Sequence, residues 1–146
     1  MSKSKKRILV VDDEDKLLTT LKMILDRMNG HKYTTNLGIG DYSFEIVTVG
    51  DGWEALQRFK EEPFDLLISD LVMPRVDGVE LVEEIRDMGL DTAVVWITAY
   101  GSQGLQDDCR RLGVHQCLDK PLLIDEIRQA ALNAMGIGTQ PVQASI

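Results

Sequence analysis

Five short runs of mainly apolar, often β-branched residues recur along the chain, and each precedes a stretch with helical periodicity. The runs are ILVV, EIVTV, DLLIS, AVVWIT and the weaker HQCLD. Their apolar residues are consecutive rather than alternating, which indicates strands buried on both faces, as in a parallel sheet between two layers of helices. The pattern therefore predicts an α/β fold with a doubly wound, five-stranded parallel sheet.

Apolar residues at helical spacing predict one helix after each run. The predicted helices span residues 16–28, 52–60, 78–87, 105–112 and 122–135. The least regular segment, 29–43, places LGIG between two β-rich stretches, HKYTT and YSFEIVTV. This segment is compatible with a hairpin and equally with a loose surface loop.

The length of 146 residues favours a single domain. We expect this domain to span 6–135, with an insertion at 29–43. A disordered basic stretch is expected at 1–5, and a flexible tail or the start of a linker at 136–146, where the periodicity ends.

Composition excludes several classes of function. A net charge of −8 and a pI near 4.7 argue against direct nucleic-acid binding, which needs clustered Lys and Arg. No apolar run reaches membrane-spanning length, and the first ends at once in acidic residues, unlike a signal peptide. We therefore expect a cytoplasmic protein without a membrane contact. Cys109 and Cys117 lack metal-ligand spacing and are predicted to be reduced thiols.

The informative polar residues follow the predicted strands, where a doubly wound sheet binds its ligands. Asp12 and Asp13 follow the first strand, Asp70 ends the third, Thr98 ends the fourth and Lys120 follows the fifth. Each has an ordinary structural explanation on its own. Together, three carboxylates at one edge repel one another by about 4 kcal/mol per close pair at an effective dielectric constant near 20. A bound cation is therefore expected.

The predicted ligand atoms are all oxygens, which is typical of Mg2+ rather than zinc. Magnesium in turn favours a phosphoryl ligand. A carboxylate beside it can act as a nucleophile toward phosphorus and form an acyl phosphate, while an ammonium and a hydroxyl group neutralise the phosphoryl oxygens. The residues thus support phosphoryl transfer to an aspartate.

The motifs RILVVDDED, LLISDLVMPRVDG, WITAYG and LDKP occur in this order. Together they resemble the receiver domains of two-component response regulators over about residues 6–135. The resemblance implies a flavodoxin-like topology with strand order 2-1-3-4-5. It also implies a phosphoacceptor domain, not an enzyme, that phosphorylates itself from a phosphodonor.

The resemblance assigns the metal site residue by residue. Asp70 would be the phosphoacceptor and, with Asp13, would bind Mg2+ directly. Asp12 would act through a metal-bound water, and Val72 would supply its backbone carbonyl.

The same resemblance assigns the groups around the phosphoryl oxygens. Lys120 would pair with these oxygens, and Thr98 would turn inward to bond them. Pro121 would follow a cis peptide bond. The donor would be a sensor histidine kinase or a histidine phosphotransfer protein, and the output would pass to a downstream protein or a detached output domain that the sequence does not identify.

The sequence departs from the family pattern at Cys117 and at the insertion 29–43, which leaves Asp13 and Asp70 at a separation of 57 residues, about a dozen more than the family pattern implies. Cys117 stands where many members carry an aromatic residue that turns inward, and Tyr100 is an alternative for that role. Neither Val72 nor Tyr100 is an acid or an amide, so neither would orient an attacking water, which predicts slow autodephosphorylation. Trp53 and Trp96 are interpreted as packing residues.

Three other functions fit the sequence less well. A haloacid dehalogenase-type phosphatase would use Asp13 as its nucleophile, with Asp15 at the required spacing, but Leu17 stands where that family has Thr or Val. A flavodoxin-like cofactor module lacks support because DDED after the first strand would repel phosphate. A docking adaptor with a silent site would not need the complete set of site residues.

Overall fold

The computed structural model describes residues 3–30, 39–99 and 104–137. Its five parallel strands form one sheet with the order β2-β1-β3-β4-β5, which confirms the predicted architecture. The strands are β1 (Ser4–Val11), β2 (Tyr42–Val49), β3 (Leu66–Asp70), β4 (Ala93–Thr98) and β5 (Gln116–Asp119). β1 lies inside the sheet, because Ile8 is paired with Ile46 of β2 on one side and Leu66 of β3 on the other.

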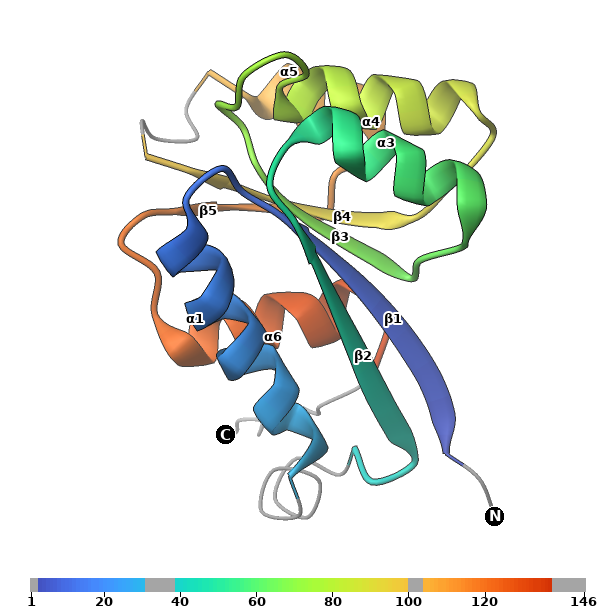
Figure 1. Ribbon diagram of the computed structural model, residues 1–146, viewed down its shortest axis with the longest axis vertical. Helices are drawn as coiled ribbons and strands as arrows, with labels where there is room; N and C mark the ends of the chain where they lie inside the picture. Colours follow the sequence, from blue (N-terminus) through green and yellow to red (C-terminus); the bar gives the residue numbers. More distant parts are fainter. Residues whose placement is uncertain (1–2, 31–38, 100–103, 138–146) are drawn as a thin grey trace, which may run out of the picture.

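Helices cover both faces of the sheet (Figure 1). They are α1 (Asp15–Asp26) with the short 3-10 helix η1 (Arg27–Asn29), α3 (Gly52–Glu61), α4 (Gly78–Asp87), α5 (Gln106–Leu112) and α6 (Ile124–Ala134). α1 and α6 lie on one face, and α3, α4 and α5 lie on the other. Within the described residues, no helix is both long enough and apolar enough to span a membrane.

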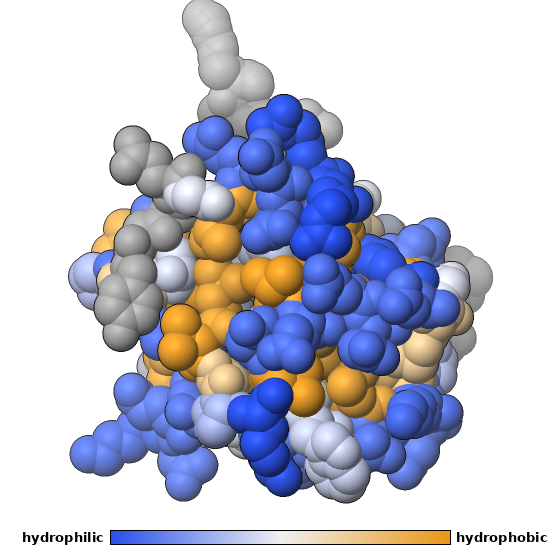
Figure 2. All heavy atoms as spheres, turned by 90° about the horizontal axis from the view of Figure 1, so that it is seen from above, coloured by the Kyte–Doolittle hydropathy of each residue, from blue (hydrophilic) through white to orange (hydrophobic). Residues whose placement is uncertain are grey.

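Successive residues of a strand supply two separate cores. Ile8 and Val10 pack with α1 and α6, whereas Leu9 and Val11 pack with the helices of the opposite face. This alternation explains the continuous apolar runs of β1, β3 and β4, because these strands are covered by helices on both faces. Figure 2 shows the face of α3, α4 and α5 from above, where apolar side chains gather in a patch between polar ones.

The domain is longer at both ends than the sequence pattern predicts. β1 begins at Ser4, and Ser4 and Lys5 pair with Tyr42 and Ser43, so the prediction of disorder through residue 5 is wrong there. At the other end, the N–H of Ile137 donates to Leu132 O at 2.9 Å, and its side chain is buried in the core beside α1 and α6. The flexible tail therefore cannot begin at 136.

The predicted hairpin is only partly within the described residues. Its first stretch, HKYTT, lies at 31–35, outside them, while the second belongs to β2, which pairs with β1. Asn29 ties the end of η1 to that strand, since its Nδ2 donates to Phe44 O at 2.9 Å and its Oδ1 accepts from Phe44 N at 2.7 Å. The side-chain amide of Asn29 thus bonds both backbone groups of Phe44 at the start of the insertion, as the backbone of a neighbouring strand would.

Arg86 is a stabilising residue that the helical pattern does not reveal. Its guanidinium donates to the carbonyl oxygens of Leu112 at 2.8 Å, Leu90 at 3.0 Å and Thr92 at 2.8 Å, and so joins the end of α4 to α5 and to the approach to β4. Burial lowers the pKa of Arg86. One side chain thus supplies hydrogen bonds to three backbone carbonyl groups.

Arg86→Met is expected to lower the free energy of unfolding by about 2 kcal/mol, because buried carbonyls lose their donors while the aliphatic volume is kept. Urea denaturation followed by far-UV circular dichroism measures this change. The exposed Arg110 pairs only with Asp107 at 3.4 Å among the ion pairs of the described chain, so Arg110→Met is the control. Equal effects of the two substitutions would contradict the assignment.

Candidate functional site

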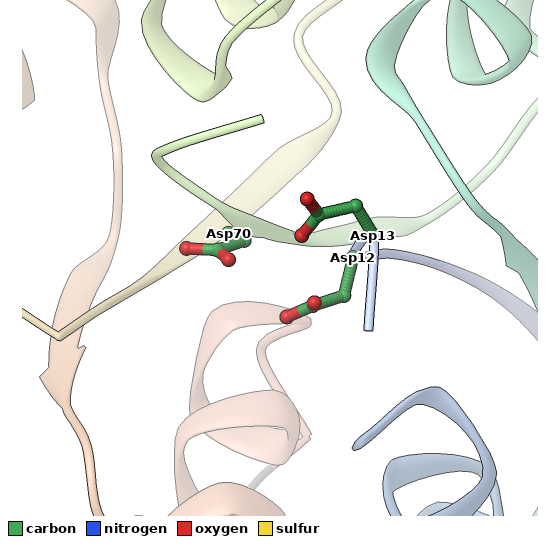
Figure 3. Close-up of side chains that lie close together, drawn as sticks. All are labelled: Asp12, Asp13 and Asp70. Atoms are coloured by element: carbon green, nitrogen blue, oxygen red, sulfur yellow. The ribbon is translucent and has the colours of Figure 1, made fainter. Parts of the chain in front are cut away.

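Three carboxylates meet at the carboxyl edge of the sheet. Asp12 and Asp13 directly follow β1, and Asp70 is the last residue of β3, the neighbouring strand. Each offers an oxygen within 4.8 Å of the others, and Figure 3 shows the three side chains lying close together. The prediction that these strand ends converge is confirmed, because parallel neighbours end at the same edge.

The three carboxylates differ in exposure. Asp12 is 1% exposed and Asp70 is 7% exposed, whereas Asp13 is exposed. Asp13 and Asp12 are adjacent in the chain, so their side chains leave the strand end in different directions. Asp12 and Asp70 thus lie at the buried end of the site, and Asp13 lies at its solvent-exposed side.

Asp12 is the electrostatically unfavourable member of the cluster. Its Oδ1 accepts from Glu14 N at 2.8 Å, but Oδ2 is buried and has no hydrogen-bond partner within the described part of the chain. The Lys120 ammonium lies 3.8 Å from Oδ2. Burial, together with the negative charge of Asp70, raises the pKa of Asp12 to about 6. The Lys120 ammonium therefore does not offset the cost of burying the Asp12 charge beside Asp70.

The Asp70 carboxylate lies between a cation and a backbone amide. Lys120 Nζ is 3.5 Å from its Oδ2, and Val72 N–H donates to its Oδ1 at 3.4 Å. Both contacts are at the long limit of hydrogen bonding, so they leave the carboxylate oxygens free to accept closer partners. The predicted lysine and the predicted acceptor are thus side by side.

The loop 71–77 leads from Asp70 to α4 under tight steric limits. A Cβ built on Gly78 would lie 2.6 Å from Asp70 O, so only glycine fits there. Asp77 then caps α4. Its Oδ1 accepts from Glu80 N at 2.9 Å, and its own N–H donates to the Glu80 side chain at 3.4 Å. This capping box fixes where the loop ends.

Thr98 and Lys120 are brought to the same edge by the pairing of β4 with β5. Thr98 is buried at the end of β4, and its carbonyl accepts from Lys120 N at 2.8 Å. The Lys120-Pro121 peptide bond is cis, as the resemblance implies. The backbone thus places the ammonium of Lys120 toward Asp70 and Asp12.

The donor atoms of this site fit a hard divalent cation. All are oxygens, three carboxylates share one small volume, and a buried Asp12 oxygen lacks a hydrogen-bond partner among the described residues. Such a set is typical of Mg2+, which prefers a few carboxylates and retained water. The aspartate cluster is therefore suited to a metal ion.

Comparison with known proteins places this geometry in a family. Residues 8–132 match the family model described as the response regulator receiver domain. The chain belongs to this family. The receiver domain is 28% identical over 133 residues to the response regulator receiver protein CpdR of Brucella abortus, covering 88% of this chain and 99% of CpdR. It is 29% identical over 125 residues to the chemotaxis protein CheY of Bacillus subtilis, covering 85% of this chain and 92% of CheY.

Other relatives are much longer. The sensor histidine kinase RcsC of Escherichia coli is 30% identical over 122 residues, which is 84% of this chain but only 11% of RcsC. Among solved structures, the response regulator protein TrrA of Thermotoga maritima, in complex with Mg(2+)-BeF, is 31% identical with a TM-score of 0.69, covering 88% of this receiver domain and 98% of TrrA. A receiver domain protein from Clostridium thermocellum is 26% identical with a TM-score of 0.73, covering 90% and 94% of the two chains.

Cys117 and Tyr100, the two residues considered for the aromatic position that turns inward, differ in whether the structure describes them. Tyr100 lies outside the described residues, so its proposed switch role stays a prediction. Cys117 is half-buried on β5, and burial raises the pKa of its thiol to about 11. Both cysteines of the receiver domain are free thiols, as predicted.

One interpretation from the sequence is wrong. Trp96 is fully buried, but Trp53 is 52% exposed at the start of α3 and is not a core packing residue. Its ring instead lies 5.8 Å from the guanidinium carbon of Arg75. Neither Arg75 nor its contacts had a signal in the periodicity of the chain, since the partners are more than 20 positions apart.

Proposed function

We propose that this receiver domain accepts a phosphoryl group on Asp70 in a Mg2+-dependent reaction. The supporting observation is that the Asp70 carboxylate shares one small volume with two further carboxylates and the Lys120 ammonium. Membership of the receiver family supports a role in two-component signalling. The domain would act as a phosphoacceptor that supplies its own catalytic groups, not as an enzyme that turns over a separate substrate.

Asp12, Asp13 and Asp70 would hold the metal ion, together with the backbone carbonyl of Val72. When bound, Mg2+ would neutralise negative charge on the transferring phosphoryl group. Asp12 Oδ2, which is buried and has no hydrogen-bond partner among the described residues, supports this assignment, because a buried carboxylate oxygen gains most from a cationic partner. The Mg2+ in the TrrA complex belongs to a protein of 31% identity and is in keeping with the proposal.

The transfer step would use this chain's own side chains. An Asp70 oxygen attacks the phosphorus of a phosphohistidine, the P–O bond forms as the P–N bond breaks, and the electron pair of that bond returns to the imidazole nitrogen. The Lys120 ammonium, now 3.5 Å from Asp70, would shift to pair with a phosphoryl oxygen. The Thr98 hydroxyl at the neighbouring strand end would donate to another.

The donor would be a sensor histidine kinase or a histidine phosphotransfer protein. One relative that this chain resembles is itself named a sensor histidine kinase, which supports a kinase as the source of the phosphoryl group. The output would pass to a downstream protein through a surface that changes when roughly 1.5 to 2 negative charges are added at Asp70.

Incubation with phosphoramidate and Mg2+, followed by intact mass spectrometry, tests the proposed function. One added phosphoryl group that hydroxylamine removes is the expected result, because acyl phosphates react with that nucleophile. The parallel sample contains EDTA in place of Mg2+. An unmodified mass in the Mg2+ sample, or equal modification in both samples, would refute the proposal.

The lifetime of the phosphorylated form is expected to be long. Val72 is 59% exposed beside Asp70 and has no polar group with which to orient an attacking water. Val72→Asn combined with Tyr100→Glu is expected to speed loss of the phosphoryl group about tenfold, because water-positioning groups lower the barrier to hydrolysis. Decay is measured by mass spectrometry in excess Mg2+ after the donor is removed, with Met88→Gln, exposed at the end of α4, as control. Equal or slower decay in the double variant would contradict the prediction.

A further inference from the structure

Arg75 has an unusual backbone conformation in the loop 71–77. Its φ is 71°, and no other non-glycine residue in the described part of the chain has a positive φ. This left-handed region is unfavourable for a side chain with a Cβ, and it persists where surrounding contacts hold it. The same loop contains Val72, the residue assigned to the metal site.

The side chain of Arg75 contacts the start of α3. Its Nη2 forms an ion pair with Oδ2 of Asp51, and its guanidinium carbon lies 5.8 Å from the centroid of the Trp53 ring. The other Asp51 oxygen accepts from Glu54 N at 2.8 Å and caps α3. The cap and the Arg75 guanidinium together lower the pKa of Asp51. One carboxylate therefore joins the helix to the loop.

The loop is also confined sterically on both sides. A Cβ built on Gly52, the first residue of α3, would clash with the carbonyl oxygen of Val76. At the other side, the Gly78 N–H donates to Leu71 O at 2.8 Å, and Gly78 packs on Asp70. The loop therefore lies between the start of α3 and the strand that carries Asp70 (Figure 1).

We propose that Arg75, Asp51 and Trp53 form a clasp that holds the backbone of Val72 beside the Asp70 carboxylate, so that Arg75 is a positioning residue for the metal site. The loop contacts the acceptor directly, because Val72 N–H donates to Oδ1 of Asp70 at 3.4 Å. This inference rests on the proposed function of the Asp70 site. Residues that orient metal ligands typically change metal affinity by about 10- to 100-fold.

Arg75→Gly is the decisive variant, because glycine accepts the positive φ while the clasp is lost. We expect the Mg2+ dissociation constant, measured by isothermal titration calorimetry at pH 7, to rise about tenfold. Removing a positive charge near an acidic site would by itself strengthen cation binding. A weaker affinity therefore cannot come from the change in charge.

Two further variants separate positioning from other effects. Arg110→Ala removes one positive charge from an exposed side chain on α5 and should leave Mg2+ affinity no weaker than in the wild type. Arg75→Lys retains a cation that can pair with Asp51 but loses the guanidinium contact with Trp53, so it should weaken Mg2+ binding less than Arg75→Gly does.

Hydrogen exchange of the metal-free protein supplies a readout that does not depend on Mg2+. The amides of 71–77 are expected to exchange faster in Arg75→Gly, while the urea midpoint stays at or above that of the wild type. Unchanged exchange, or an unchanged Mg2+ dissociation constant in a wild type that does bind Mg2+, would overturn the positioning role and leave the proposed function standing. A wild type that binds no Mg2+ would overturn both.

Discussion

Asp70→Asn is expected to abolish uptake of the phosphoryl group, so that no modified protein is detected by mass spectrometry after incubation with phosphoramidate and Mg2+. An amide lacks the anionic oxygen that attacks phosphorus. The substitution keeps the shape of the side chain, and it removes one charge from a site where three carboxylates repel one another. The variant should therefore stay folded, which circular dichroism checks.

Asp13→Asn separates the receiver mechanism from that of a dehalogenase-type phosphatase. Asp13 would be a metal ligand in the first case and the nucleophile in the second. We expect this variant still to be phosphorylated on Asp70, but only at higher Mg2+ concentration. Asp87→Asn, at the end of α4, is the control. A phosphoryl group mapped by peptide analysis to Asp13 in the wild type would show that the assignment of Asp70 is wrong.

Asp12→Asn is expected to have opposite effects on stability and on metal binding. The Asp12 carboxylate is 1% exposed, and its pKa is raised from 3.8 to about 6, so at pH 7, where it is ionised, its charge lowers the stability of the folded state. Because one pKa unit corresponds to about 1.4 kcal/mol, this rise in pKa leads us to expect that the metal-free variant is about 3 kcal/mol more stable at pH 7. The stabilisation that Mg2+ gives the wild type should be lost. Urea denaturation with and without Mg2+ measures both effects.

The pH dependence of this difference has a defined sign. The pKa of Asp12 is higher in the folded state than in the unfolded state, so the folded state holds more protons between pH 4 and pH 6. The metal-free wild type therefore loses stability from this group as the pH rises through that range, and Asp12→Asn does not. The advantage of the variant should be small near pH 4 and fully developed at pH 7. A difference that stays constant from pH 4 to pH 7 would contradict the assigned cause.

The fold and the location of the site follow from local patterns. Consecutive apolar residues require strands buried on both faces, and parallel strands bring their carboxyl ends to one edge. The polar residues that end these strands therefore converge without any knowledge of distant contacts. This reasoning placed Asp12, Asp13 and Asp70 together, with Lys120 beside them, as observed.

Only the tertiary structure decided how these residues differ from one another and what supports them. Asp12 is buried and Asp13 is exposed, although the two are neighbours of the same chemical type. The burial of Ile137, the exposure of Trp53 and the contact between Arg75 and Asp51 likewise depend on segments far apart in the chain. Periodicity reports which side of its own helix or strand a residue occupies. Exposure and pKa depend instead on what other elements place against that side, and packing alone settles this.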